Sequence, residues 1–293
     1  KPMNCPHHIE IFARKKWSFR DLPQRYASTT KIYRDEQTGE LSGLTRVRSI
    51  TQDDAHVFCN MDKTESELED IWEIVQEFYR TFNLPLKLRL SLRDPKQSKK
   101  YLGDRNVWEG AEATLRTVVK RKGGDYFETE GEAAFYGPKL DFMATDSLGR
   151  EWQVATIQLD LNMPNQFDLE FTNTDGKQSK IYIIHAAIMG AIERFMAILI
   201  EHYAGAFPLW LSPMQVSIIP ISEKHLEYAD KIKKELEKNN IRAELKNENE
   251  TLGKKIREAE MQKTPYLLIL GDKEIQNQLV SVRQSGKGDI GAI

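Results

Sequence analysis

Residues 207–213, with the sequence FPLWLSP, limit what this chain can fold into, because they place two prolines between a helical pattern and a new strand pattern. Proline fixes φ and has no backbone N–H, so a helix or a central strand does not continue through such a segment. The length of 293 residues also suits about two domains of roughly 150 residues each. We therefore expect one domain over residues 1–210 and a second over residues 211–293.

The first of these domains carries both helical and strand patterns. Apolar residues three and four positions apart indicate helices, and short alternating or apolar runs between turn signals indicate strands. The helix-like stretches are 64–82, 108–122 and 185–203, and the strand-like stretches are 86–92, 135–144 and 152–161. Thr64 and Glu67 resemble a capping box, and the turn residues 146–149 predict that the last two strands form an antiparallel hairpin.

The second domain alternates strand and helix patterns along its whole length. The strand-like stretches are 215–221, 241–245, 266–270 and 279–283, and the helix-like stretches are 223–239 and 252–262. This alternation is typical of an α/β domain.

Charge, cysteine content and hydropathy narrow the class of protein. The formal net charge of −2 neither demands nor excludes a nucleic-acid partner. The two cysteines, Cys5 and Cys59, are too few for a disulfide framework and suit a reducing compartment, so we expect a cytoplasmic protein. The most apolar stretch, 182–200, is interrupted by a histidine and two charged residues, which argues against a membrane span, and the chain does not open like a signal peptide.

Three potential metal ligands lie far apart in the sequence: Cys5, His56 and His185. A thiolate and two imidazoles suit zinc and leave a fourth position open for a substrate. Asp54 lies on the same side as His56 if the run is extended, and could orient a substrate amine or hydroxyl. Spacing alone does not decide between this site and ordinary buried or surface side chains. The remaining histidines are read as structural or surface residues: His7, His8, His202 and His225.

Several arginines could bind an anion. Arg34 and Arg46 flank a glycine-containing loop and would face each other across a hairpin, where a planar guanidinium fits a phosphate. Gly190 and Arg194 are four residues apart, which places them on one face of the expected helix. A glycine there costs about 1 kcal/mol relative to alanine, which is tolerable if a ligand approaches the backbone. Solvated arginines and simple helix packing remain alternatives.

Taken together, six segments resemble bacterial threonyl-tRNA synthetases, in the same order and over essentially the whole chain. They are KPMNCP at 1–6, YRDE at 33–36, LTRVR at 44–48, TQDDAH at 51–56, FYGPK at 135–139 and residues 185–195. Arg34 and Glu36 resemble class II motif 2, and residues 190–195 resemble motif 3. Motif 1 would lie upstream of this sequence, and the second domain is expected to extend beyond its last residue.

The resemblance implies an α+β class II catalytic domain, an antiparallel sheet flanked by helices, followed by an α/β anticodon-binding domain. It also implies a threonine–tRNA ligase, which forms threonyl-adenylate from L-threonine and ATP and then charges tRNA(Thr). When the family's ligand positions are carried over to this sequence, Cys5, His56 and His185 hold one Zn²⁺, which binds the amino and hydroxyl groups of threonine. A homodimer and Mg²⁺ bound with ATP are also implied.

The same carry-over assigns the remaining site residues. The threonine pocket comprises Met3, Asp54, Tyr136 and Gln158, and Gln52 lies near the carboxyl end. The ATP positions are Arg34, Glu36, Arg46, Lys139, Gln153 and Arg194, among which Arg34 and Arg194, with Gln52, are the expected catalytic residues. The anticodon positions are Asn249, Lys263, Glu274 and Arg283.

The chain departs from the family pattern at a few of these places. Ile50 replaces an aromatic residue that stacks on adenine, and His7 replaces a glycine beside the metal loop. Ala186 and Ala191 replace a common arginine and a common serine, and Lys263 replaces an arginine. Two alternatives to a threonine–tRNA ligase therefore stay open: a catalytically inactive synthetase-like paralogue that binds tRNA, and a class II enzyme for another amino acid such as proline or serine.

Overall fold

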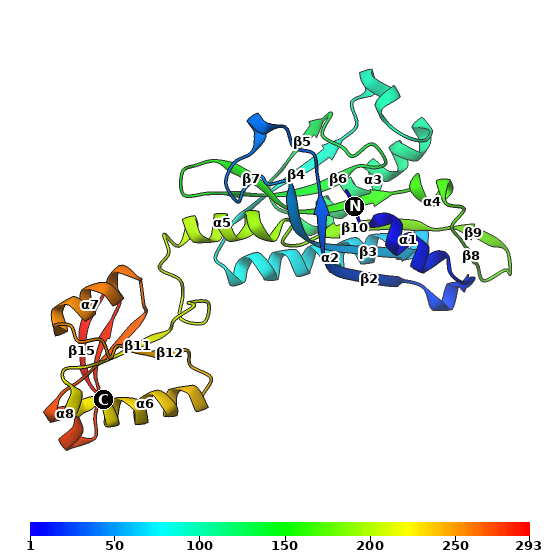
Figure 1. Ribbon diagram of the computed structural model, residues 1–293. Coiled ribbons are helices and arrows are strands. Elements are labelled where there is room, and N and C mark those ends of the chain that lie inside the picture. The colour runs from blue at the N-terminus through cyan, green and yellow to red at the C-terminus, as the bar shows by residue number, and fades with distance from the viewer. The chain divides into compact units, whose positions relative to one another are not determined.

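The computed structural model describes residues 1–293 and separates into two compact units, Lys1–Leu199 and Ile200–Ile293. The first unit is built on a seven-stranded sheet in the order β2-β3-β10-β7-β6-β4-β5 (Figure 1). Its strands are β2 Gln24–Tyr33, β3 Ser49–Cys59, β4 Leu86–Leu92, β5 Tyr126–Glu130, β6 Lys139–Thr145, β7 Glu151–Asp160 and β10 Tyr182–Ala187. All neighbours are antiparallel except β4 and β5. This is the α+β arrangement, an antiparallel sheet flanked by helices, that the sequence predicts for the first domain.

Two long helices, α2 (Met61–Thr81) and α3 (Arg105–Lys122), pack on this sheet. Their apolar stripes are buried, and Trp72 of α2 meets Phe142 of β6 edge to face with ring centroids 5.3 Å apart. Burial of such a stripe, rather than intrinsic propensity, stabilises most protein helices.

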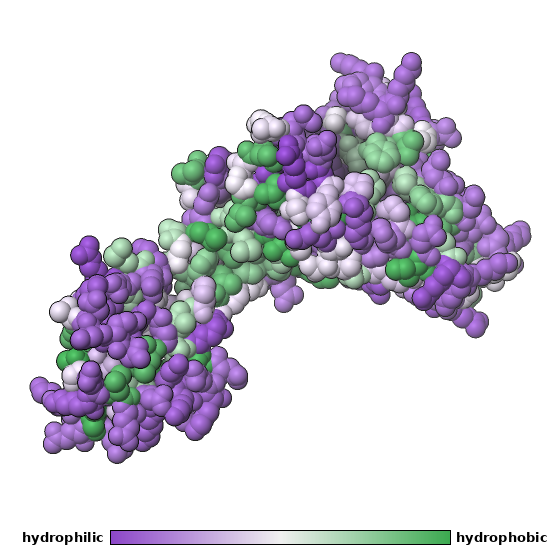
Figure 2. Space-filling model, viewed as in Figure 1, coloured by the Kyte–Doolittle hydropathy of each residue, from purple (hydrophilic) through white to green (hydrophobic).

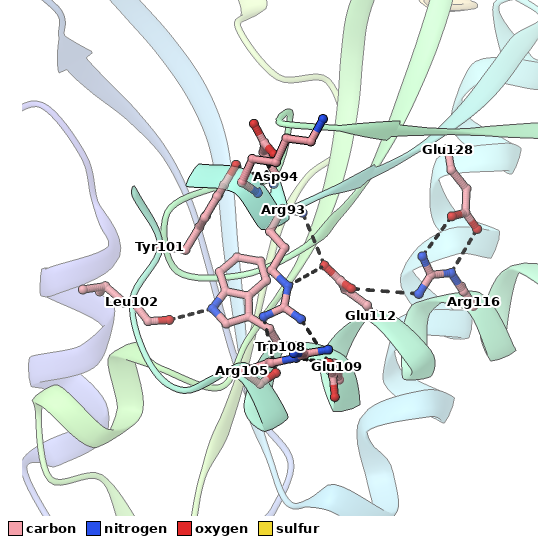
Figure 3. A network of polar contacts seen from close by, with 11 residues as sticks. Arg93, Asp94, Tyr101, Leu102, Arg105, Trp108, Glu109, Glu112, Arg116 and Glu128 are labelled. Carbon is pink, nitrogen blue, oxygen red and sulfur yellow. Dashed lines mark hydrogen bonds and ion pairs between the residues drawn. The ribbon is translucent and has the colours of Figure 1, made fainter. Parts of the chain in front are cut away.

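Ion pairs fix the first turns of α3 against the end of β4 (Figure 3). Arg93 lies 3.6 Å from both Glu109 and Glu112, and its backbone N–H donates to Glu112. Trp108 is buried and donates its indole N–H to the carbonyl of Leu102. The charges of Arg93, Glu109 and Glu112 are therefore paired with one another within the fold.

Smaller elements complete the first unit. They are α1 Cys5–Ala13, α4 Met163–Gln166, α5 Ile192–His202, the sheet of β1 Trp17–Ser18, β8 Glu170–Thr172 and β9 Gln178–Lys180, and the 3₁₀ turns Phe19–Asp21, Thr38–Glu40 and Pro95–Lys100. The last helix among them, α5, begins in this unit and ends past its boundary at Leu199. Phe12 of α1 stacks on Phe58 of β3 with centroids 4.5 Å apart, so the residues after Cys5 are anchored to the main sheet. No helix combines the length and the apolar character needed to span a bilayer.

The second unit has a five-stranded sheet in the order β12-β11-β13-β14-β15. Its elements are β11 Val216–Pro220, the 3₁₀ turn Glu223–His225, α6 Leu226–Lys238, β12 Ala243–Leu245, α7 Leu252–Met261, β13 Tyr266–Leu270, α8 Asp272–Asn277, β14 Ser281–Gln284 and β15 Gly288–Ala292. Strands β12, β11 and β13 are parallel. One core cluster joins α6 to this sheet and another joins α7, so helices cover both faces, as an α/β domain requires.

Two local predictions are wrong. Thr64 and Glu67 do not form a capping box, because α2 begins at Met61 and both residues are buried inside it. The helical stretch expected from residue 185 is the strand β10 as far as Ala187, and α5 begins only at Ile192. A short apolar run cannot be told from a buried helix by its period alone, which explains the second error.

The hydrophilic residues dominate the visible surface, with apolar residues scattered among them (Figure 2). This is the ordinary surface of a globular protein.

Candidate functional site

Three neighbouring strands carry the centre of the site in one register. His185 of β10 pairs with His56 of β3 on one side and with Gln158 of β7 on the other. Cys5 begins α1, and its Sγ lies with one ring nitrogen from each of His56 and His185 in a group whose members are all within 4.8 Å. Three residues separated by up to 180 positions in sequence therefore meet at one point.

The unused ring nitrogens fit a metal ion at that point. Nε2 of His56 and Nδ1 of His185 are buried and have no hydrogen-bond partner. The opposite nitrogens are engaged: Nδ1 of His56 lies 2.8 Å from Nδ1 of His8, and Nε2 of His185 lies 3.0 Å from Asp160. Metal-binding histidines are usually oriented in this way through their second nitrogen. His7 is exposed and lies outside the group.

The electrostatics of the two histidines differ. Burial, with the neighbouring His185 and His8, lowers the pKa of His56 to about 2, so its imidazole is neutral, the form that binds metals. Burial alone would lower the pKa of His185, but Asp160 and Cys5 raise it to about 9. Burial also raises the pKa of Asp54 to about 6, and its carboxylate lies 3.9 Å from His56. The extended strand thus places Asp54 beside His56, as the sequence indicated.

A cavity of about 340 Å³ opens over the group. Its wall includes the predicted threonine-pocket residues, two of the three predicted metal ligands and Arg34: Met3, Cys5, Arg34, Gln52, Asp54, Tyr136, Gln158 and His185. Tyr136 donates its hydroxyl to Gln158, and burial raises the pKa of that hydroxyl. The cavity is lined by both hydrogen-bonding side chains and a potential metal site, which is the composition of a small polar ligand pocket.

A second cavity of about 320 Å³ shares Arg34, Gln52 and Gln158 with the first. Its other walls include Lys139, Gln153, Ile50 and Arg194. Burial lowers the pKa of Arg194, and the nearby charges of Arg46 and Arg34 lower it further. Cations held this close to one another favour an anionic ligand between them.

Glu36 and Arg46 do not line either cavity. Instead, Arg46 donates to Glu36 at 3.0 Å in the loop between β2 and β3, and it also pairs with Glu40. The hairpin is present as predicted, but Arg46 lies in the connection and not in a strand.

The turn before α5 corrects the expected role of Gly190. It has φ +72°, and a Cβ there would lie 2.7 Å from the carbonyl oxygen of Val154, so the position requires glycine. The carboxylate of Asp53 accepts the backbone N–H groups of Ile188, Met189 and Gly190 at 2.7 to 2.9 Å. Gly190 therefore precedes the helix that carries Arg194 and does not share a helical face with it.

The four predicted anticodon residues lie in the second unit. Asn249 is exposed in the loop before α7, and Lys263 follows α7 with φ +60°. Glu274 accepts the backbone N–H of Gly271 and the hydroxyl of Ser281, both at 2.8 Å.

Arg283 lines a cavity of about 220 Å³ and lies 3.3 Å from Glu260. Its Nε is buried without a hydrogen-bond partner.

Sequence reasoning missed the residues that support the site from behind, namely His8, Asp53, Asp141 and Asp160. Only His8 carried a usable signal: it follows Cys5 by three residues, so the two share a face of α1. The carboxylates of Asp53, Asp141 and Asp160 bind groups on other strands or turns that lie far away in the sequence. No local sequence pattern predicts contacts of this kind.

Comparison with known proteins gives a consistent result. Residues 1–203 match the family model of the tRNA synthetase class II core domain (G, H, P, S and T), and residues 215–293 match that of the anticodon binding domain. Proteins named threonine–tRNA ligase from Rubrobacter xylanophilus and Bacteroides thetaiotaomicron are each 49% identical, over 98% and 100% of this chain. The match covers 45% and 46% of those proteins, so the chain spans about half their length.

A solved structure gives the same picture. It is described as the RNA binding domain of threonyl-tRNA synthetase from Cryptosporidium parvum, and it superposes with a TM-score of 0.91 at 37% identity. The superposition covers 98% of this chain and 71% of the other.

Proposed function

This chain belongs to the threonine–tRNA ligase family of class II synthetases, and we propose that the protein carrying it activates L-threonine with ATP and charges tRNA(Thr). Residues 1–210 would catalyse both steps, and residues 211–293 would bind the anticodon. We also expect a cytoplasmic homodimer, from the cysteine content and the family resemblance.

One observation carries this proposal. Sγ of Cys5 and one ring nitrogen each of His56 and His185 lie within 4.8 Å of one another, beside a cavity whose wall includes Cys5, His185 and Asp54. A bound Zn²⁺ would supply a Lewis-acidic template for the amino and hydroxyl groups of threonine. Proline offers no hydroxyl group to such a template, so this donor set favours a hydroxy amino acid.

The chain's own residues would complete threonine recognition. The carboxylate of Asp54 would accept a hydrogen bond from the substrate hydroxyl, and Tyr136 and Gln158, which line the same cavity, would also hold the amino acid. Met3 would contact the apolar part of threonine. Gln52, which lines both cavities, would lie near the carboxylate of threonine, at the junction between the two cavities.

The second cavity is where we place ATP with its Mg²⁺. The threonine carboxylate would attack the α-phosphate, forming the new P–O bond as the bond to pyrophosphate breaks. Arg34 would hold the α-phosphate at the junction, and Arg194 the outer phosphates. Lys139 and Gln153 would contact the nucleotide, and Arg46 and Glu36 would reach it from the hairpin loop. This reaction needs positioned reactants and stabilised charge rather than a protein nucleophile.

The second step transfers the threonyl group to the terminal ribose of the tRNA, with release of AMP. Anticodon contacts in the second unit would come from Asn249, Lys263, Glu274 and Arg283. Lysine at position 263 offers a single point charge where an arginine would offer a fork, so its base contact would be less specific.

Amino-acid-dependent exchange of pyrophosphate into ATP, measured on the full-length protein, tests the proposal. We expect activation of threonine, rejection of valine by ~10⁴-fold or more, and incomplete rejection of serine, which lacks only a methyl group. Activation of proline alone would show that the site serves another amino acid. If no amino acid supports exchange while tRNA still binds, the protein is the inactive paralogue.

A further inference from the structure

Asp141, in the middle of β6, is a fully buried carboxylate with four hydrogen-bond donors and a further ion-pair partner. Its Oδ1 accepts from the side chains of Gln153 at 2.7 Å and Thr156 at 3.0 Å. Its Oδ2 accepts from Ser91 at 2.7 Å and Arg89 at 3.0 Å, and Nζ of Lys139 lies 3.1 Å away. Both carboxylate oxygens are therefore engaged by donors from three strands.

Strand register explains how most of these groups reach one carboxylate. Asp141 is paired with Arg89 of β4 on one side and with Thr156 of β7 on the other, and directly paired residues share a face of the sheet. Lys139 is two residues from Asp141 on the same strand and so also shares this face.

Gln153 reaches the carboxylate through an irregularity. Gln153 and Thr156 are three residues apart, so in a regular strand they would face opposite sides of the sheet. The register of β6 and β7 shifts between Phe142 and Met143, which leaves Val154 as an extra residue on β7. This β-bulge turns Gln153 to the same face as Thr156, and both then donate to Oδ1 of Asp141.

The groups held in this way belong to the second cavity. Lys139 and Gln153 line this cavity and not the first, Thr156 lines both, and Asp141 lies behind the wall. Lys139 and Gln153 each retain further N–H donors after binding Asp141, because an ammonium has three and an amide two. The carboxylate thus fixes their side chains while leaving donors free for a ligand.

Burial of this carboxylate is costly unless it is paired, and one cationic partner of Asp141 lies outside the cavity wall. Arg89 does not line the second cavity, yet it supplies a guanidinium 3.0 Å from Oδ2. With Arg89 as a counterion, Asp141 does not depend on Lys139 alone for charge compensation, and Lys139 keeps positive charge available toward the cavity.

We propose that Asp141 is a positioning residue for the nucleotide, acting through Lys139 and the bulge-directed Gln153. The inference rests on the proposed function, since it takes the second cavity as the ATP site. It predicts that loss of the carboxylate impairs use of ATP more than use of threonine, because Lys139 and Gln153 line the second cavity and not the first, and neither the metal group nor Asp54 contacts Asp141.

The test compares Asp141→Asn with wild type in the full-length protein, by threonine-dependent pyrophosphate exchange and by urea unfolding. Asparagine keeps the shape but has no charge and only one acceptor oxygen, so in either orientation it cannot accept from the donors at both Oδ1 and Oδ2. We expect KM for ATP to rise about tenfold, as for one misplaced charge-assisted contact, with KM for threonine within about twofold of wild type.

Two further variants keep the test decisive. Ser91→Ala removes one hydrogen bond to Asp141 from the side away from the cavity, so it should lower stability slightly and leave KM for ATP unchanged. Asp141→Glu keeps the charge beside Lys139 but displaces the carboxylate, so its KM for ATP should lie between wild type and Asp141→Asn. It also replaces Asp141→Asn if that variant does not fold.

The outcomes separate the two proposals. If wild type activates no amino acid, the proposed function fails. Suppose instead that wild type activates threonine, and that the variants at Asp141 lose stability while KM for ATP and KM for threonine change equally or not at all. Asp141 then only stabilises the fold, and the positioning role is overturned.

Discussion

The Nδ1 atoms of His8 and His56 lie 2.8 Å apart, which is close enough for only one of them to carry a proton in the hydrogen bond. If Nε2 of His56 binds a cation, its proton must be on Nδ1 and must be donated to His8. Burial, with the charges of His7 and Lys1, lowers the pKa of His8, so a neutral acceptor is available. The pair therefore fixes the tautomer of His56 that a metal needs.

The first prediction follows from this contact. His8→Ala should weaken Zn²⁺ binding about 10- to 100-fold, because His56 loses the partner that orients its ring. Competition with a chromophoric chelator measures that affinity without reference to activity. His7→Ala, a change at the exposed neighbour, is the matched control and should bind as wild type does. Equal affinity in the two variants would refute the role of His8.

A second prediction separates the two cysteines. Cys5→Ala should abolish stoichiometric zinc, because it removes the only thiol from the donor group. Cys59→Ala should keep about one Zn²⁺ per chain, since Cys59 is buried beside Thr64 and lies outside the group. Elemental analysis of both purified variants checks the assignment. Zinc retained by Cys5→Ala would show that the metal is held elsewhere.

The third prediction concerns the nucleotide. Ile50 lines the second cavity, at the position where the family resemblance places an aromatic residue against adenine. Ile50→Phe should lower KM for ATP by about two- to tenfold, since an aromatic pair contributes ~0.5–1.5 kcal/mol beyond area burial. Pyrophosphate exchange at varied ATP measures this, and KM for threonine serves as the internal control. A parallel change in both constants would contradict adenine stacking.

The fourth prediction is the pH dependence of the turn between β6 and β7. Burial of Asp146 would raise its pKa, but Trp152, Arg150 and the N–H of Leu148 donate to it and lower its pKa to about 2. The folded-state pKa lies below the unfolded value near 4, so the carboxylate stabilises the fold above about pH 4. That stability is lost as the pH falls toward about 2.

Urea unfolding followed by tryptophan fluorescence between about pH 5 and about pH 3 measures this loss. Asp146→Asn should be less stable than wild type at the upper end and should lose less stability on acidification. Asp175→Asn, at an exposed turn, should follow wild type throughout. An acid profile of Asp146→Asn that coincides with wild type would remove Asp146 as the cause.

The sequence predicted the elements whose own pattern is decisive. The strand at 86–92 was expected from strict alternation, and the structure has β4 at Leu86–Leu92; the strand at 266–270 likewise matches β13. The fold class was also predicted correctly. The pattern at residues 185–187 wrongly predicts a helix, because a buried central strand is apolar on both faces and shows no alternation.

What the sequence could not supply is contact at long range. The hydrogen bond between Asp53 and Gly190 joins residues 137 positions apart. The β-bulge at Val154 exists only because β6 pairs with β7. The roles carried over for the site residues, and the domain limit at residue 210, stay predictions until variants are measured.

The shared register of His56, His185 and Gln158 makes the donor group sensitive to strand pairing. A slip of β10 by one residue would rotate His185 to the opposite face of the sheet and leave the cation with two donors. Only correctly assembled chains could then retain the ion through dialysis. Metal content would thus serve as a quality measure for refolded preparations, independent of any substrate.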